Sequence, residues 1–80
     1  MLLYLYKLIN MYQMFTWSTF NSNISKWDVS KVEDMHEMFA NAKFAKDISK
    51  WNVSNVDDHN GMFDDCPLED KPEYQPIFED

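Results

Sequence analysis

A period of 24 residues constrains this chain more than any other feature of its sequence. The pair Met-Phe recurs at residues 14–15, 38–39 and 62–63, and Trp27 and Trp51 stand between these pairs in the same register. Residues 14–32 and 38–56 are identical at ten of nineteen positions. A fixed period of about 20 to 29 residues is typical of stacked turns of chain, because one such repeat cannot bury its apolar face alone. We therefore expect like residues of successive copies to lie against one another.

Each copy also has an internal pattern that predicts a short helix followed by a short strand. Residues 30–33, Ser-Lys-Val-Glu, fit a capping box, and Val32, Met35, Met38 and Phe39 follow at the spacing of one helical face. This predicts a helix over about residues 31–41. Residues 24–29 and 48–53 alternate Trp and Val with polar residues, which favours a half-buried strand. The predicted fold class is an α/β solenoid whose 24-residue turns each hold a short helix and a short parallel strand.

The repeat pattern divides the chain into two regions. Residues 1–68 are predicted to form the repeat solenoid, with a degraded first repeat and about three turns in all. Residues 69–80 are rich in acids and contain two of the three prolines, which cannot continue a helix or a hydrogen-bonded ladder. We expect this tail to cap the last turn, because a stack of repeats needs a polar outer face at its end.

The charge of the chain excludes several classes of partner. The net charge is −7, and the chain contains no arginine, the residue best suited to grip phosphate groups and guanine. Nucleic-acid binding is therefore not expected. The apolar first fifteen residues are interrupted by Lys7, Asn10 and Gln13 and have no recognisable signal-peptide features. Membrane insertion is not expected, since a spanning helix needs about 20 apolar residues.

Three groups of residues could carry chemistry, but their spacing argues against it. The run Asp57–Asp65 looks like a calcium loop, yet placing Gly61 at its glycine position puts Val56 at position one and Pro67 at position twelve. His36, His59 and Cys66 lack the paired spacing of a zinc site, and Cys66 aligns with the small residues Ser18 and Ala42. We expect no cofactor, no metal site and no enzyme activity, with Cys66 as a packing residue and His59 half-buried in the last turn.

The positions that vary between copies are better candidates for a binding surface. Core residues must recur in every turn, whereas contact residues need not. On the predicted strands, the outward positions are Lys26 and Asp28 in one copy, and Lys50 and Asn52 in the next. These four residues form the predicted protein-contact face.

The pattern MF…F…IS-K-W-DVS-x-V-x-DM-x-x-MF resembles the repeats of BspA-like leucine-rich-repeat surface proteins, including a mycoplasma-type domain of unknown function. The resemblance covers about residues 8–68. It implies a leucine-rich-repeat-like fold, a location on the cell surface or outside the cell, adhesion to other proteins, and no shared catalytic residues. Because the chain shows no recognisable signal peptide, its localisation is left open.

The predicted function is a non-enzymatic repeat scaffold for protein–protein interaction, with surface adhesion as its specific form. The alternative is a structural fragment or C-terminal terminator of a longer repeat array, without activity of its own. The apolar run Leu2–Tyr6 also suggests self-association through the N-terminal edge. The protein partner is not identified by the sequence.

Overall fold

The structure is a computed structural model that describes residues 10–79. The apolar run Leu2–Tyr6, and the self-association predicted through it, lie outside the described residues.

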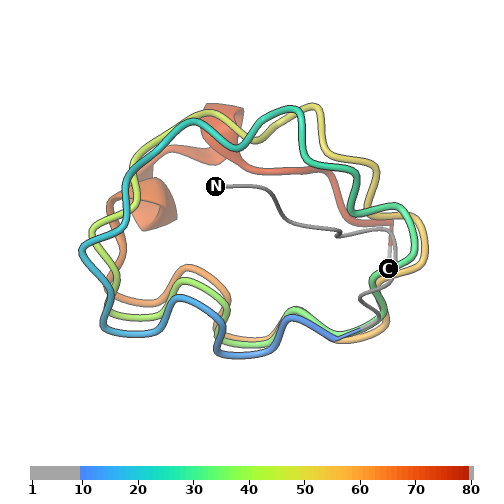
Figure 1. Ribbon diagram of the computed structural model, residues 1–80, viewed down its shortest axis with the longest axis horizontal. Coiled ribbons are helices and arrows are strands. Elements are labelled where there is room, and N and C mark those ends of the chain that lie inside the picture. The colour runs from blue at the N-terminus through green and yellow to red at the C-terminus, as the bar shows by residue number, and fades with distance from the viewer. Residues whose placement is uncertain (1–9, 80) are drawn as a thin grey trace.

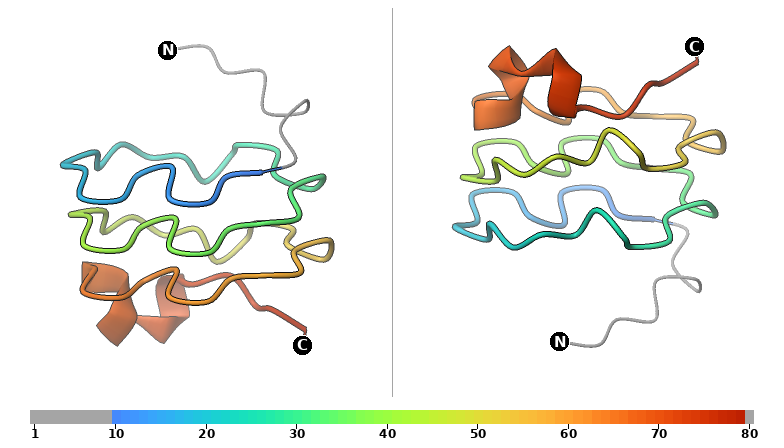
Figure 2. Two further views of the ribbon diagram at one scale, coloured as in Figure 1. Left: turned by 90° about the horizontal axis from the view of Figure 1, so that it is seen from below. Right: turned by 90° about the horizontal axis from the view of Figure 1, so that it is seen from above.

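The described chain winds round in successive parallel turns that lie on top of one another (Figures 1 and 2). Isolated parallel bridges join Asn10 to Asp34 and Asp34 to Asp58, so each turn returns to the same place after 24 residues. We call residues 10–33, 34–57 and 58–79 the first, second and third windings. The expected contact between like residues of successive copies is present along this stack.

One side of every winding is a serrated segment, formed by residues 10–18, 34–42 and 58–66 and visible along the lower edge of Figure 1. In the second winding, alternate backbone N–H groups of Met35, Glu37, Phe39 and Asn41 donate to carbonyls of the third winding at 2.8–2.9 Å. The N–H groups of Met38, Ala40 and Ala42 instead donate to carbonyls three residues earlier in the same winding, at 3.0–3.1 Å. The backbone therefore alternates between bonds to its neighbour and bonds within itself.

Left-handed backbone conformations recur with the period of the repeat and create the serration. The three residues at one position of the repeat have φ between 53° and 65°, and those four positions later have φ between 55° and 62°. These residues are Gln13, Glu37 and Gly61, followed by Trp17, Asn41 and Asp65. Each bends the chain, and such a conformation costs a residue other than glycine roughly 1–2 kcal/mol.

The predicted helix over residues 31–41 is wrong, and so is the α/β solenoid. Within residues 10–79 the only helices are two short 3₁₀ turns near the C-terminal end, and the bridges are isolated rather than parts of strands. A helix cannot pass through the left-handed Glu37 and Asn41. The predicted capping box is absent, because the Ser30 hydroxyl donates to Asp28 Oδ1 at 2.6 Å.

The predicted strands at residues 24–29 and 48–53 are replaced by turns. The Trp27 N–H donates to the Ile24 carbonyl and the Trp51 N–H to the Ile48 carbonyl, both at 3.1 Å. These bonds span three residues and use the donors that a parallel ladder would need. The apolar residues of these segments still face inward, with Val53 5 % exposed.

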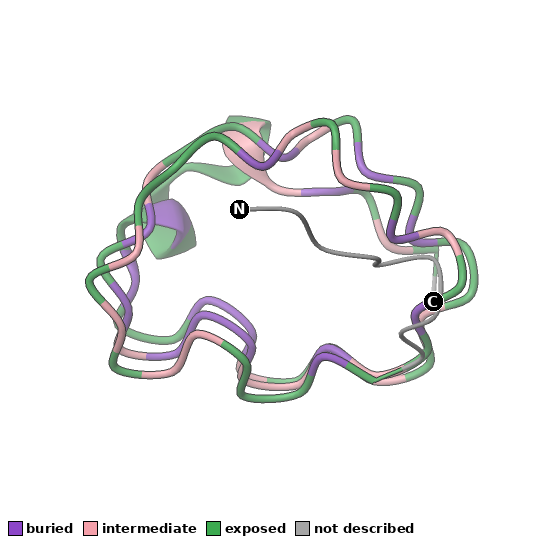
Figure 3. Ribbon diagram, viewed as in Figure 1, coloured by how far each residue is buried: buried purple, intermediate pink, exposed green. Residues whose placement is uncertain are grey.

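The core is a stack of aromatic rings taken from equivalent positions of successive windings. Phe39 lies between Phe15 and Phe63, with ring centroids 5.4 and 5.9 Å away and interplanar angles of 10° and 3°. Phe44 stacks on Phe39 at 4.5 Å. The indole N–H of Trp51 donates to the carbonyl of Ile24 in the winding before it, at 3.0 Å. Figure 3 shows the buried residues recurring at the same places in each winding.

The third winding ends in the 3₁₀ helices η2 (Pro67–Asp70) and η3 (Pro72–Tyr74), each of which begins with a proline. Leu68 of η2 is fully buried, and Tyr74 and Phe78 pack partly buried against the core, while Ile77 is 79 % exposed. The tail therefore covers part of the last winding with its apolar side chains. No helix among residues 10–79 is long and apolar enough to cross a membrane.

Candidate functional site

The four residues of the predicted contact face are all exposed, but they lie on turns rather than on a flat strand ladder. Lys26 and Lys50 are each the third residue of a four-residue turn that ends at a tryptophan. Asp28 and Asn52 follow those tryptophans. Because both sets recur after 24 residues, they form a column two windings high, which we call the turn column.

Two residues of the turn column also stabilise their own loops. Asp28 Oδ1 accepts hydrogen bonds from the Ser30 backbone N–H at 3.0 Å and from its hydroxyl at 2.6 Å. Asn52 Oδ1 accepts the equivalent bonds from Ser54 at 3.1 and 2.8 Å. The Ser30 hydroxyl, and then its N–H, lower the pKa of Asp28 below the ordinary value of 3.8. The Asp28 carboxylate thus carries a negative charge that its loop holds in a fixed position.

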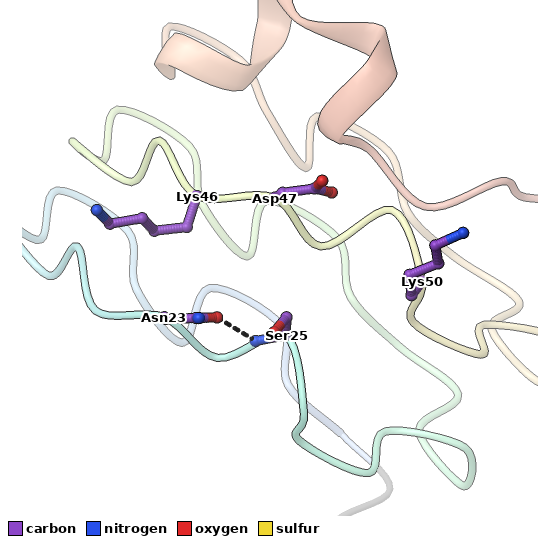
Figure 4. Close-up of a pocket in the computed structure, with 5 residues that line it drawn as sticks. All are labelled: Asn23, Ser25, Lys46, Asp47 and Lys50. Carbon is purple, nitrogen blue, oxygen red and sulfur yellow. Dashed lines mark hydrogen bonds between the residues drawn. The ribbon is translucent and has the colours of Figure 1, made fainter.

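A hollow of about 270 Å³ lies beside the turn column and shares Lys50 with it (Figure 4). The first winding supplies Asn23 and Ser25, joined by a 2.9 Å bond from the Ser25 N–H to Asn23 Oδ1. The second winding supplies Lys46 and Asp47, and in Figure 4 the side chains of Lys46 and Lys50 extend on opposite sides of Asp47. Sequence reasoning found only Lys50 of this group. The recurrence of Asn or Asp at residues 23 and 47, and of Ser at residues 25 and 49, could have indicated that these polar residues lie near one another in successive windings.

A second polar group joins the serrated segments of two windings. His36 Nδ1 lies 2.9 Å from Asp34 Oδ1 and 3.9 Å from Asp58 Oδ2. The ring of His36 also stacks on that of Tyr12, with centroids 5.1 Å apart. Within residues 10–79, no other group of three or more His, Cys, Asp or Glu side chains is arranged so that it could hold a metal ion.

This group is best explained as an ion pair that ties windings together. The hydrogen bond with Asp34 raises the pKa of His36 above its ordinary value of 6.5, and the charges of Asp34, Asp58 and Glu37 act in the same direction. Asp34 Oδ1 also accepts the His36 backbone N–H at 3.0 Å, and this bond lowers the pKa of Asp34. When His36 is protonated, its single positive charge therefore offsets part of the negative charge of two carboxylates that the stacking brings close together.

We expect NMR titration to show a pKa for His36 above 6.5, and the Asp34→Asn variant to bring it back toward that ordinary value. Asp58→Asn should lower it less, because Asp58 is farther away. Since the folded pKa exceeds the unfolded one, the ion pair stabilises the fold fully below pH 6.5, and this contribution is lost as the pH rises through the folded pKa. A wild-type His36 pKa at or below 6.5 would contradict the ion pair.

The other residues that the sequence singled out have separate structural roles. Cys66 is 4 % exposed, and its thiol donates to the Phe44 carbonyl at 3.2 Å, which confirms the predicted packing role. Burial raises the pKa of this thiol, so it is a poor nucleophile. His59 is half-buried, as predicted, with its ring stacked on Phe78 at 3.8 Å. The acidic run Asp57–Asp65 contributes only Asp58 to the group around His36.

The comparison with known families agrees with the extent of this repeated architecture. The model of one family, described as Mycoplasma protein of unknown function, DUF285, matches residues 5–73. Neither a curated protein nor a solved structure matches the chain. Because the family match spans most of the chain and includes all three serrated segments, this protein belongs to the DUF285 family.

Proposed function

We propose that this protein is a non-enzymatic repeat module that binds another protein through the turn column and the adjoining hollow. The observation that supports this most directly is that the buried and the exposed positions of the repeat hold different kinds of residue. The recurring aromatic and aliphatic residues are buried in the core, whereas polar residues, of which Asp28 and Asn52 differ between copies, lie exposed on successive turns. Such an array offers a binding surface on which side chains can be substituted without disturbing the packing of the core.

The pattern of charge supports recognition of a polar protein surface. The turn column alternates Lys26 and Asp28 in one winding with Lys50 and Asn52 in the next, and Asp28 is held in place by Ser30. Complementary charges across an interface contribute mainly to specificity and to the rate of encounter. The resemblance to BspA-like surface repeats supports adhesion as the biological form of this binding.

The test exchanges charges without removing the loop hydrogen bonds. The column variant carries Lys26→Glu, Asp28→Asn, Lys50→Glu and Asn52→Asp, so that position 28 and position 52 keep an acceptor oxygen. The control carries Lys43→Glu and Lys71→Glu, which change the net charge equally at exposed positions outside the turn column and the hollow. Proteins retained from solubilised surface extracts are quantified and their affinities measured with purified partners. We expect a partner bound at least tenfold more weakly by the column variant than by the wild type or the control. Equal binding by all three would reject this surface.

A second candidate, a terminator of a longer array, is supported by the polarity of the stack. In the second winding the carbonyls of His36, Met38 and Ala40 accept N–H groups from the first winding. The equivalent carbonyls of Tyr12, Met14 and Thr16 accept no hydrogen bond from residues 10–79, and the side chains of Tyr12 and Met14 are exposed. Sedimentation equilibrium distinguishes the two candidates: a stable monomer favours the module, and concentration-dependent association favours the array element.

A further inference from the structure

Two backbone N–H groups of the third winding stand at positions from which the second winding donates hydrogen bonds to the winding after it. Glu37 and Phe39 donate their N–H groups to the carbonyls of Asn60 and Met62 in the next winding, both at 2.9 Å. Gly61 and Phe63 occupy the same positions of the repeat one winding later. Within residues 10–79 their N–H groups have no acceptor, whereas the neighbouring Asp65 N–H is taken by Glu69 Oε1 at 3.2 Å.

A groove of about 240 Å³ lies at these two donors. One wall is the serrated segment from His59 to Asp64, and the other comes from Glu69, Gln75 and Phe78 of the C-terminal tail. The Gln75 side chain donates to the Leu68 carbonyl at 2.7 Å, so the tail wall is tied to η2. The tail therefore leaves room beside the last serrated segment instead of covering it completely.

We infer that this groove binds an extended, basic peptide, which adds to the serrated segment as a further winding would. Two carbonyl oxygens of the peptide, two residues apart, accept the N–H groups of Gly61 and Phe63. Bonds of this kind are how extended peptides add to an exposed backbone edge. The paired bonds of Glu37 and Phe39 show that this backbone shape aligns both donors with carbonyls at that spacing.

The pairing seen between windings favours a peptide over a small anion. The equivalent donors of the second winding, Glu37 and Phe39, each bond to a separate carbonyl, that of Asn60 or Met62. A peptide supplies two such carbonyls, two residues apart.

The side chains round the groove specify what the peptide carries. Asp64 and Glu69 are exposed acids that line the groove, and residues 57–80 contain nine acids against one lysine, Lys71. Phe78, which is half-buried, supplies apolar surface. Alternation of basic and apolar residues therefore fits the groove. This inference rests on the proposed protein-binding function, and it names a partner class for a surface distinct from the turn column.

The first experiment follows amide protons by NMR in the whole protein. In the unbound protein, the amides of Gly61 and Phe63 should exchange at least tenfold faster than those of Glu37 and Phe39, which serve as internal controls. Adding acetyl-(Lys-Leu)₃-amide should slow exchange at Gly61 and Phe63 at least tenfold and shift both resonances downfield. Acetyl-(Glu-Leu)₃-amide should leave them unchanged. The inference is overturned if both amides are already as protected as the controls, or if the basic peptide does not affect them.

The second experiment tests the acids with matched variants. Asp64→Asn with Glu69→Gln should weaken binding of the basic peptide about fivefold, because two exposed charge contacts are lost. Glu69→Gln keeps an oxygen for the Asp65 N–H. The control, Asp70→Asn with Glu73→Gln, removes the same charge from exposed positions outside the groove and should bind as the wild type does. Equal weakening by both pairs would reject the role of the groove acids.

The two proposals can fail separately. In the column variant, acetyl-(Lys-Leu)₃-amide should still slow exchange at Gly61 and Phe63, because the substitutions lie outside the groove. Peptide binding without any partner for the turn column would reject the proposed contact surface and leave the groove assignment standing. A partner for the turn column without peptide binding would do the reverse.

Discussion

Replacing Phe39 by alanine is expected to destabilise the protein by about 3–5 kcal/mol, which is close to the whole stability of so small a chain. Phe39 is fully buried and is the middle rung of the aromatic stack, with Phe15 and Phe63 on its two sides and Phe44 beside it. The substitution removes contacts from two neighbouring windings at once. Urea denaturation followed by tryptophan fluorescence should show a large fall in the midpoint or an unfolded chain in water.

The position of a ring within the stack should decide the size of the effect. Phe15, in the first winding, is only half-buried and lies against one later rung instead of between two. Phe15→Ala should therefore cost roughly half as much as Phe39→Ala. Equal losses at both positions would mean that burial of each ring in its own winding, and not stacking between windings, stabilises the fold.

Replacing Glu37 by proline is expected to cost at least about 3 kcal/mol. Proline fixes φ near −65°, whereas Glu37 has a φ of 53°. It also removes the N–H that donates to the Asn60 carbonyl at 2.9 Å. The free energy of unfolding, measured in urea, should fall accordingly.

Glycine at the same position is the matched control. Glu37→Gly keeps the N–H and removes the left-handed strain, so it should stabilise the protein by about 0.5–1 kcal/mol. It loses the 2.7 Å bond from Gln13 Nε2 to Glu37 Oε1, but that bond is exposed. Destabilisation by glycine comparable to that by proline would show that residue 37 does not need the left-handed conformation.

The candidate sites differ in how far the sequence predicted them. The sequence predicted that Lys26, Asp28, Lys50 and Asn52 point outward, because polar positions alternate there with recurrent apolar ones, and all four are exposed. The group of Asp34, His36 and Asp58 was missed, since it forms only when residues 24 positions apart are placed side by side. The C-terminal groove was missed for a similar reason. Its donors are backbone N–H groups of Gly61 and Phe63, and no side-chain pattern marks a backbone group that lacks an acceptor.

The sequence by itself determined the repeat length, the register in which copies meet, and the residues that are buried. Identical residues at a fixed spacing must take equivalent places if each winding is to cover the apolar face of the next, so Phe15, Phe39 and Phe63 stack. Only the tertiary structure decided the backbone path between those places. An apolar spacing of three and four residues also suits a serrated chain, and the choice against a helix is made by hydrogen bonds between windings. Those bonds require left-handed residues such as Glu37 and Asn41, and the sequence pattern does not indicate that conformation at these positions.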